Sequence, residues 1–107
     1  MTRSQPFTLI YDPDVANRLR SIAKKHHPLI RSVIEEQLQH EPAVESRNRK
    51  PLQQPAAFEA TWELRLGPKN CFRVLYAVDL QWEEVHILAI GVKDRNRLIV
   101  GGEEIEL

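Results

Sequence analysis

Two arginines, Arg65 and Arg73, lie in the middle of two short segments whose apolar residues alternate as they do in β-strands. A guanidinium group stays charged at neutral pH and can bond two oxygens of one phosphate, so such residues suit phosphate binding. Segments 62–66 and 72–76 are separated by a turn signal at Gly67-Pro68. If both apolar faces enter one core, even-numbered residues pair with even-numbered ones. Arg65 then lies opposite Arg73 on the outer face. Because like charges directly across a strand pair are destabilising, this register predicts a sheet face that binds an anion.

The other basic residues are distributed in groups along a chain with no net charge. The 107 residues include 15 basic and 15 acidic ones. The even balance weighs against a general nucleic-acid-binding protein, which usually carries a basic excess, but it is compatible with a basic face. The groups are Arg47, Arg49 and Lys50 before the hairpin, Lys69 in its turn, and Lys93, Arg95 and Arg97 after the last predicted strand.

Composition excludes several kinds of protein. One cysteine, Cys71, gives no internal disulfide and fits a reducing compartment, and four scattered histidines give no zinc signature. We therefore expect neither a metal nor another cofactor. No apolar run approaches the roughly 18 residues of a membrane span, and the N-terminal apolar stretch is too short for a signal peptide. The composition is that of an ordinary globular protein, and we expect one domain over residues 1–107 in the cytoplasm.

The elements that must position these arginines begin with a strand and two helices. Residues 7–11 predict a first strand. Asp12-Pro13 predicts the start of a helix that ends near His26, and a second helix is expected from Pro28 to about His40. Residues 41–58 are polar and contain three prolines, so they predict a loop.

Three strands are expected after this loop, at about 59–66, 71–79 and 84–92. The last residues, RLIVGGEEIEL, allow a further short strand with a Gly-Gly turn. Trp62 and Tyr76 would be core residues, whereas Trp82 falls in a predicted turn and is a candidate contact residue. The order β-α-α-β-β-β predicts an α+β fold. In this fold an antiparallel sheet of about four strands carries an N-terminal two-helix hairpin on one face.

Several of these segments resemble the RelE/ParE superfamily of toxins from type II toxin–antitoxin systems, and its RelE branch in particular. The resemblance is carried by WELR (62–65), FRVLY (72–76), ILAIGVKDR (87–95), Lys50-Pro51-Leu52 and the helical hairpin. It implies a ribosome-dependent endoribonuclease that cuts mRNA and inhibits translation. In that reaction the 2′-hydroxyl attacks the adjacent phosphate without a metal, and basic side chains stabilise the developing charge. The resemblance also implies a cognate antitoxin protein as partner, with the ribosome and mRNA as targets.

The candidate site residues come from positions matched to the superfamily, namely Arg65, Arg73, Lys93 and Arg95, and from the other basic groups along the chain. The catalytic candidates are Arg73, Arg65 and Arg95. The candidates for RNA binding are Arg47, Arg49, Lys50, Lys69, Lys93 and Arg97. Glu63 stands where the RelE branch often has lysine, and it is either a replacement that weakens activity or a carboxylate base.

Two classes of function therefore remain open. The basic residues after the last strand favour an mRNA interferase. Glu63, the zero net charge and the absence of a tyrosine near the C-terminus, where residues 98–100 are Leu-Ile-Val, favour a protein that does not cleave RNA. Such a protein would be a gyrase inhibitor of the ParE kind or a degenerate toxin that only binds its antitoxin.

Overall fold

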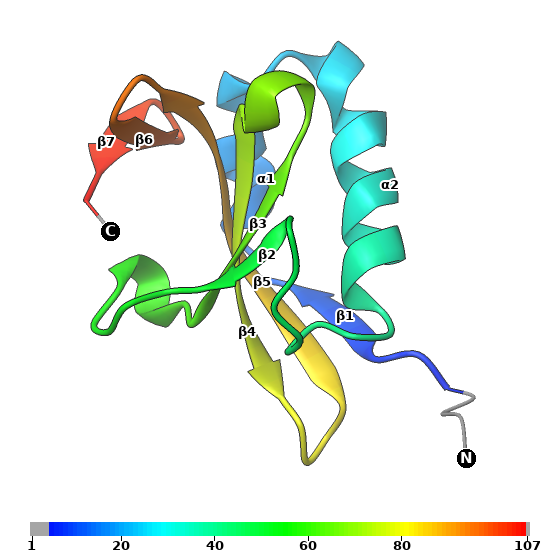
Figure 1. Ribbon diagram of the computed structural model, residues 1–107. Helices are drawn as coiled ribbons and strands as arrows, with labels where there is room; N and C mark the ends of the chain where they lie inside the picture. The colour runs from blue at the N-terminus through cyan, green and yellow to red at the C-terminus, as the bar shows by residue number, and fades with distance from the viewer. Residues whose placement is uncertain (1–4, 107) are drawn as a thin grey trace.

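A computed structural model describes residues 5–106 and shows helices packed on one side of a long, bent sheet (Figure 1). The helices and strands are β1 (Thr8–Tyr11), α1 (Val15–Arg18), α2 (His27–Leu38), β2 (Arg49–Pro51), β3 (Trp62–Leu66), β4 (Phe72–Asp79), β5 (Glu84–Asp94), β6 (Arg97–Val100) and β7 (Glu103–Ile105). Single 3₁₀ turns occur at Leu19–Ser21, Lys24–His26, Ala57–Glu59 and Pro68–Asn70.

The sheet corrects the expected number and order of strands. Seven strands lie in the described part of the chain, in the order β2-β3-β4-β5-β6-β7, and β1 pairs with β5 outside this path. All neighbours are antiparallel except β1 and β5, which are parallel. The predicted number, about four, was too low for two reasons. Strand β2 lies in the segment expected to be a loop, and the C-terminal residues form two strands.

The long strand β5 organises this arrangement. Its first half, Glu84–Ile87, pairs with β1, and its second half, Gly91–Asp94, pairs with β6. Both partners lie along the edge of β5 that faces away from β4, since β4 pairs with β5 over its whole length. One eleven-residue strand therefore joins the part of the sheet under the helices to the C-terminal hairpin.

The first predicted helix is interrupted. After the four residues of α1 the chain passes through two 3₁₀ turns, and Ile22 between them is extended. The hydroxyl of Ser21 donates a hydrogen bond to the carbonyl of Arg18 (2.9 Å), a bond that competes with helix continuation. The Nε2 atom of His27 lies 3.1 Å from the Leu19 carbonyl and 2.9 Å from the Ile22 carbonyl, and so contacts two carbonyls at the break.

The main core lies between α2 and the inner face of the sheet. It includes Ile30, Ile34, Leu38, Leu64, Val74, Tyr76 and Ile87, each no more than 2% exposed. Tyr76 donates a 2.7 Å hydrogen bond from its hydroxyl to the Pro42 carbonyl and stacks on the half-buried Trp62 at 6.2 Å between ring centres. The prediction that Tyr76 is a core residue is confirmed.

A second, smaller core lies on the opposite face of the sheet. Its buried members are Ala60, Leu75, Ala89, Leu98 and Val100. The β6–β7 hairpin lies on the side of the sheet away from α2 (Figure 1). Strand β6 can approach β5 closely at Gly91 only because glycine has no Cβ atom. A Cβ atom there would lie 2.5 Å from the Ile99 carbonyl oxygen. The β6–β7 hairpin therefore covers part of the outer face of the sheet, and it forms one wall of the candidate site.

Candidate functional site

Arg65 and Arg73 lie directly opposite each other on β3 and β4, in the register that the alternating pattern predicts. The Arg65 side chain is 37% exposed, whereas the Arg73 side chain is 10% exposed. The Nε–H of Arg73 donates a 2.9 Å hydrogen bond to the carbonyl of Asn70 in the turn between the two strands. The hairpin thus holds one arginine firmly and leaves the other more accessible to solvent.

The carboxylate of Glu63 lies between these two cations. Its Oε1 atom accepts hydrogen bonds from Arg65 Nε at 2.9 Å and from Arg73 Nη1 at 3.2 Å. Glu63 lies on the predicted face but is only 3% exposed. An anion does offset the two like charges, but this anion belongs to the chain itself. Among residues 5–106, the hydrogen bonds to this carboxylate reach one of its two oxygens.

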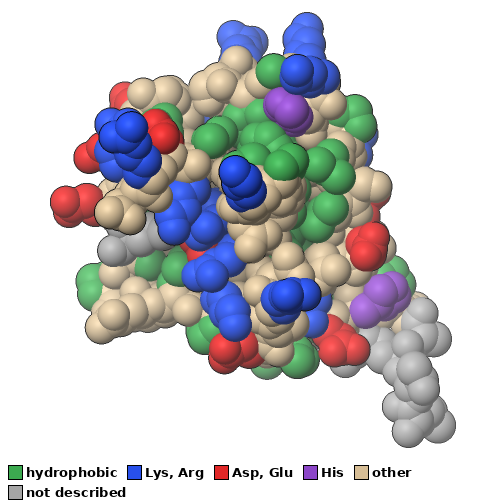
Figure 2. All heavy atoms as spheres, turned by 45° about the horizontal axis from the view of Figure 1, so that its top comes forward, with side chains coloured by type: hydrophobic (Ala, Val, Ile, Leu, Met, Phe, Trp, Pro, Cys, Tyr) green, Lys and Arg blue, Asp and Glu red, His purple; other side chains and the backbone are tan. Residues whose placement is uncertain are grey.

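These three side chains line a groove of about 530 Å³ between the outer face of the sheet and the β6–β7 hairpin. The remaining lining residues are Leu52, Lys93, Asn96, Arg97, Leu98, Glu104, Ile105 and Glu106. Figure 2 shows Lys and Arg side chains in a row across this side of the molecule, beside the C-terminal hairpin. The groove therefore brings together four basic side chains that can donate hydrogen bonds.

The groove is electrostatically mixed, because four basic and three acidic side chains line it. Arg97 pairs with Asp94 at 3.0 Å and with Glu104 at 3.6 Å. The acidic residues of the hairpin therefore lie at the rim, whereas Arg65 and Arg73 lie on the floor formed by the sheet. This arrangement weakens the overall attraction for a polyanion without removing the arginines from the groove.

Among the predicted site residues, Arg65, Arg73, Lys93 and Arg97 come together in the groove, while five others lie elsewhere. Arg95 is exposed in the β5–β6 turn with a positive φ of 59°, and Lys69 is exposed in the β3–β4 turn with a φ of 54°. Arg47 lies in the loop before β2.

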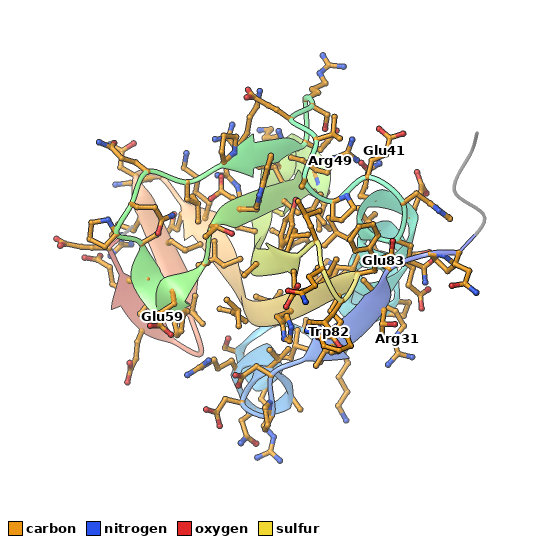
Figure 3. The ribbon with its side chains drawn as sticks, turned by 90° about the horizontal axis from the view of Figure 1, so that it is seen from below. Arg31, Glu41, Arg49, Glu59, Trp82 and Glu83 are labelled. Carbon is orange, nitrogen blue, oxygen red and sulfur yellow. The ribbon has the colours of Figure 1, made fainter. Side chains whose placement is uncertain are left out.

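Arg49 and Lys50 lie on β2, beside the hairpin. Arg49 bonds the Val44 carbonyl (2.9 Å) and the side-chain oxygen of Gln37 (2.7 Å), so it holds the loop after α2. Figure 3 shows it at this position on β2. Lys50 is the cross-strand neighbour of Glu63, but its Nζ lies 3.5 Å from Glu45.

Sequence reasoning anticipated only part of the acidic side of this site, since it singled out Glu63 as a replaced lysine, a carboxylate base or an ion-pair partner of Arg73. Glu104 and Glu106 had no assigned role, and Glu63 was not expected to bond both arginines. One signal was available, since Glu63 and Arg65 are two residues apart on a strand and therefore share a face. The contribution of residues 104–106 depends on how the C-terminal hairpin folds back over the sheet.

The described part of the chain contains no cluster of three or more metal-ligating side chains. No helix within residues 5–106 is long and apolar enough to cross a membrane.

Comparison with known proteins adds one informative match. No protein-family model and no curated protein sequence matches the chain. Among solved structures, a chain of the toxin–antitoxin complex RelBE2 from Mycobacterium tuberculosis superimposes with a TM-score of 0.68 and 22% sequence identity. The match covers 87% of this protein and 98% of that chain. The protein has a RelE-like fold.

The shared fold agrees with the architecture that the resemblance implied. The α+β class with two helices on one face of the sheet is also confirmed, with the corrected number and order of strands. At 22% identity the match establishes the fold alone, so activity rests on the groove.

Proposed function

We propose that this protein is the toxin component of a type II toxin–antitoxin module, and that it acts as a ribosome-dependent mRNA endoribonuclease. The observation that carries the proposal is the position of Arg65, Arg73, Lys93 and Arg97 in one groove of a RelE-like fold. The proposal includes a cognate antitoxin as partner and the ribosome with its mRNA as target, and it therefore places the protein in the cytoplasm.

In this reaction the groove would stabilise the negative charge that develops on the phosphate. When the 2′-hydroxyl of a ribonucleotide attacks the neighbouring phosphate, negative charge builds up on the phosphate oxygens. Fixed donors that point at this charge supply a large share of the rate enhancement. Arg73, with its bonds to Asn70 and Glu63, is such a fixed donor, and Arg65 and Lys93 add positive charge from neighbouring strands.

A purified system of translating ribosomes tests this proposal. The wild-type protein is expected to cut the messenger in the decoding site, and Arg65→Ala is expected to cut it much more slowly. Arg65→Ala leaves Glu63 paired with Arg73, so the fold should persist, which thermal unfolding checks. Arg20→Ala is the control, because Arg20 is exposed on the 3₁₀ turn after α1. Intact messenger with the wild-type protein would overturn the endonuclease proposal.

A non-cleaving protein of the same fold is the second candidate, and Glu63 is the observation that favours it. A carboxylate bonded to both arginines takes up donors that a phosphate would otherwise use. Such a protein would inhibit gyrase, as ParE-like toxins do, or would only bind an antitoxin. When the messenger stays intact, a DNA supercoiling assay tests the first outcome. A binding assay with the product of any small reading frame found next to the gene tests the second.

A further inference from the structure

Glu63 occupies a position that is unusual for a charged residue. It is 3% exposed, lies on the face of the sheet that forms the groove, and bonds two arginines through a single oxygen atom. A buried carboxylate is costly unless it is paired, and the two guanidinium groups supply that pairing. Conversely, Arg65 and Arg73 would repel each other across the strand pair without it.

The bonds determine the direction in which both guanidinium groups point. Arg65 uses its Nε–H, so neither of its two terminal nitrogens is taken up by a hydrogen bond to Glu63. Arg73 uses its Nε–H for the Asn70 carbonyl and Nη1 for Glu63, so two contacts fix the plane of its guanidinium group. A long side chain normally loses rotamer entropy when a ligand immobilises it, and here Glu63 immobilises it in advance.

The cross-strand neighbour of Glu63 does not compete for its charge. Lys50 lies opposite Glu63 on β2, and its Nζ is 3.5 Å from Glu45 at the surface. The Glu63 carboxylate therefore bonds only the two arginines on the groove side of β3 among the described residues.

We propose that Glu63 is a positioning residue that holds Arg65 and Arg73 in one orientation, so that both can contact a single phosphodiester group in the groove. The expected effect of Glu63 on cleavage rests on the proposed function. The positioning itself does not depend on cleavage and can be measured directly.

Glu63→Gln is the test variant and Glu106→Gln the matched control. Glutamine keeps the shape and one oxygen acceptor. Alanine would remove the partner that the buried Arg73 shares with the more exposed Arg65, and could prevent folding. Glu106 also lines the groove and loses the same charge, but within residues 5–106 it forms no hydrogen bond or ion pair with Arg65 or Arg73. The control therefore isolates the effect of removing one negative charge from the groove. Circular dichroism and thermal unfolding verify that both variants fold.

Hydrogen exchange of the Arg65 Nε–H, followed by NMR and assigned with Arg65→Lys, reports the positioning. In Glu63→Gln this exchange is expected to accelerate by roughly ten-fold, because the bond between two opposite charges is replaced by a weaker one to a neutral amide oxygen. In Glu106→Gln it should stay at the wild-type rate. An unchanged exchange rate in Glu63→Gln would overturn the proposal.

Kinetics on ribosome-bound messenger reports the functional consequence. In Glu63→Gln, kcat is expected to fall roughly 10–100-fold, because misplaced catalytic groups cost rate even when binding persists. KM should not rise, since the groove becomes more positive. A fall in kcat no larger than that of Glu106→Gln would overturn the positioning role.

The two proposals can fail separately. If the wild-type protein leaves messenger intact, the endonuclease proposal fails, and a short single-stranded RNA then serves as the probe. Positioning predicts that this RNA shifts the Nε–H signals of Arg65 and Arg73 together in the wild type, and that Glu63→Gln uncouples the two shifts. Independent shifts in the wild type, or no shift in either signal, would overturn it.

Discussion

Arg65 and Arg73 face each other across β3 and β4, and one oxygen of Glu63 accepts a hydrogen bond from each of them. The three side chains form a unit with a net charge of one positive unit. Because they line the same groove, a phosphate that enters it meets guanidinium groups whose orientation is already set. This relationship determines which substitutions should be informative.

Arg73→Lys should separate charge from geometry. An ammonium group keeps the buried positive charge next to Glu63, but it cannot bond both Glu63 and the Asn70 carbonyl in a planar fork. Messenger cleavage is expected to fall roughly 10²-fold, the usual cost of losing a fixed donor to a developing oxyanion. Arg20→Lys, at an exposed site, is the control. Cleavage by Arg73→Lys at the wild-type rate would show that charge alone suffices.

Replacing the acidic residues at the rim of the groove should strengthen RNA binding. The double variant Glu104→Gln/Glu106→Gln removes two of the three carboxylates that line the groove. At low salt, affinity for single-stranded RNA is expected to rise by roughly 3–10-fold for this charge change close to the ligand. The gain should shrink as salt is added. Fluorescence anisotropy at several salt concentrations measures it, and Glu84→Gln, at the start of β5, is the control. An equal gain in the control would argue against a specific effect of the groove.

Gly91→Ala should displace β6 from β5. A Cβ atom at this position would lie 2.5 Å from the Ile99 carbonyl oxygen and 2.8 Å from the Val100 Cγ2 atom. Overpacking of this kind typically costs about 1–3 kcal/mol. Amide hydrogen exchange in β6 should accelerate, and RNA binding should weaken because the groove loses its wall.

Gly102→Ala provides the comparison for Gly91→Ala. Gly102 has a φ of +85°, and a Cβ atom added to it would meet no heavy atom within 4 Å, so its substitution strains the turn without any collision. Its effect on amide exchange should be confined to the β6–β7 turn. Equal exchange changes in both variants would contradict a packing role for Gly91.

Tyr76→Phe should destabilise the protein at neutral pH. The hydroxyl donates a buried 2.7 Å hydrogen bond to the Pro42 carbonyl, which connects the sheet to the loop after α2. Loss of the donor leaves that carbonyl unsatisfied, and the expected cost is about 1–3 kcal/mol. Urea denaturation measures the cost, and Tyr11→Phe, at a partly exposed residue, is the control. A loss of stability no greater than that of the control would contradict this account.

Tyr76 should also make the protein less stable at high pH. Burial raises the pKa of the Tyr76 phenol, so the folded protein keeps this group neutral, whereas the unfolded chain ionises it near pH ~10. The stabilisation is therefore fully present below that pH and is lost as the pH rises above it.

The free energy of unfolding, measured between about pH 8 and pH 11, should fall more steeply for the wild type than for Tyr76→Phe. Tyr11 adds a smaller slope to both proteins, since burial and the nearby Glu35 raise its pKa as well. Parallel curves for the two proteins would contradict the assignment to Tyr76.

Local patterns could not predict several parts of the fold. Strand β2 has three residues and ends in Pro51, so its pairing with β3 leaves almost no periodic signal. The parallel pairing of β1 depends on where the chain returns after α2, and not on its own residues. The first helix had a helical pattern, but contacts of Ser21 and His27 with backbone carbonyls accompany its interruption.

The position of Trp82 in a turn was predictable from the sequence, but the strand that lies next to this turn was not. Its place in a turn followed from the sequence, and the structure finds it 69% exposed at the β4–β5 turn beside β1 (Figure 3). The turn is local and is therefore encoded locally. Strand β1 comes from the other end of the chain, and its Thr8 N–H bonds the Glu83 carbonyl of this turn at 2.9 Å, a pairing on which a local pattern carries no information.

The hairpin register and the opposition of Arg65 to Arg73 follow from the order of the residues, because the side-chain period of a strand is two and one apolar face must be buried. What lies between the two arginines and what covers them depends on how distant segments pack. The burial of Glu63 and the rim of Glu104 and Glu106 depend on the path of β6 and β7 back over the sheet. Such contacts depend on the packing of segments about 40 residues apart, which are brought together only when hydrophobic burial in the second core offsets the entropy of closing the loop.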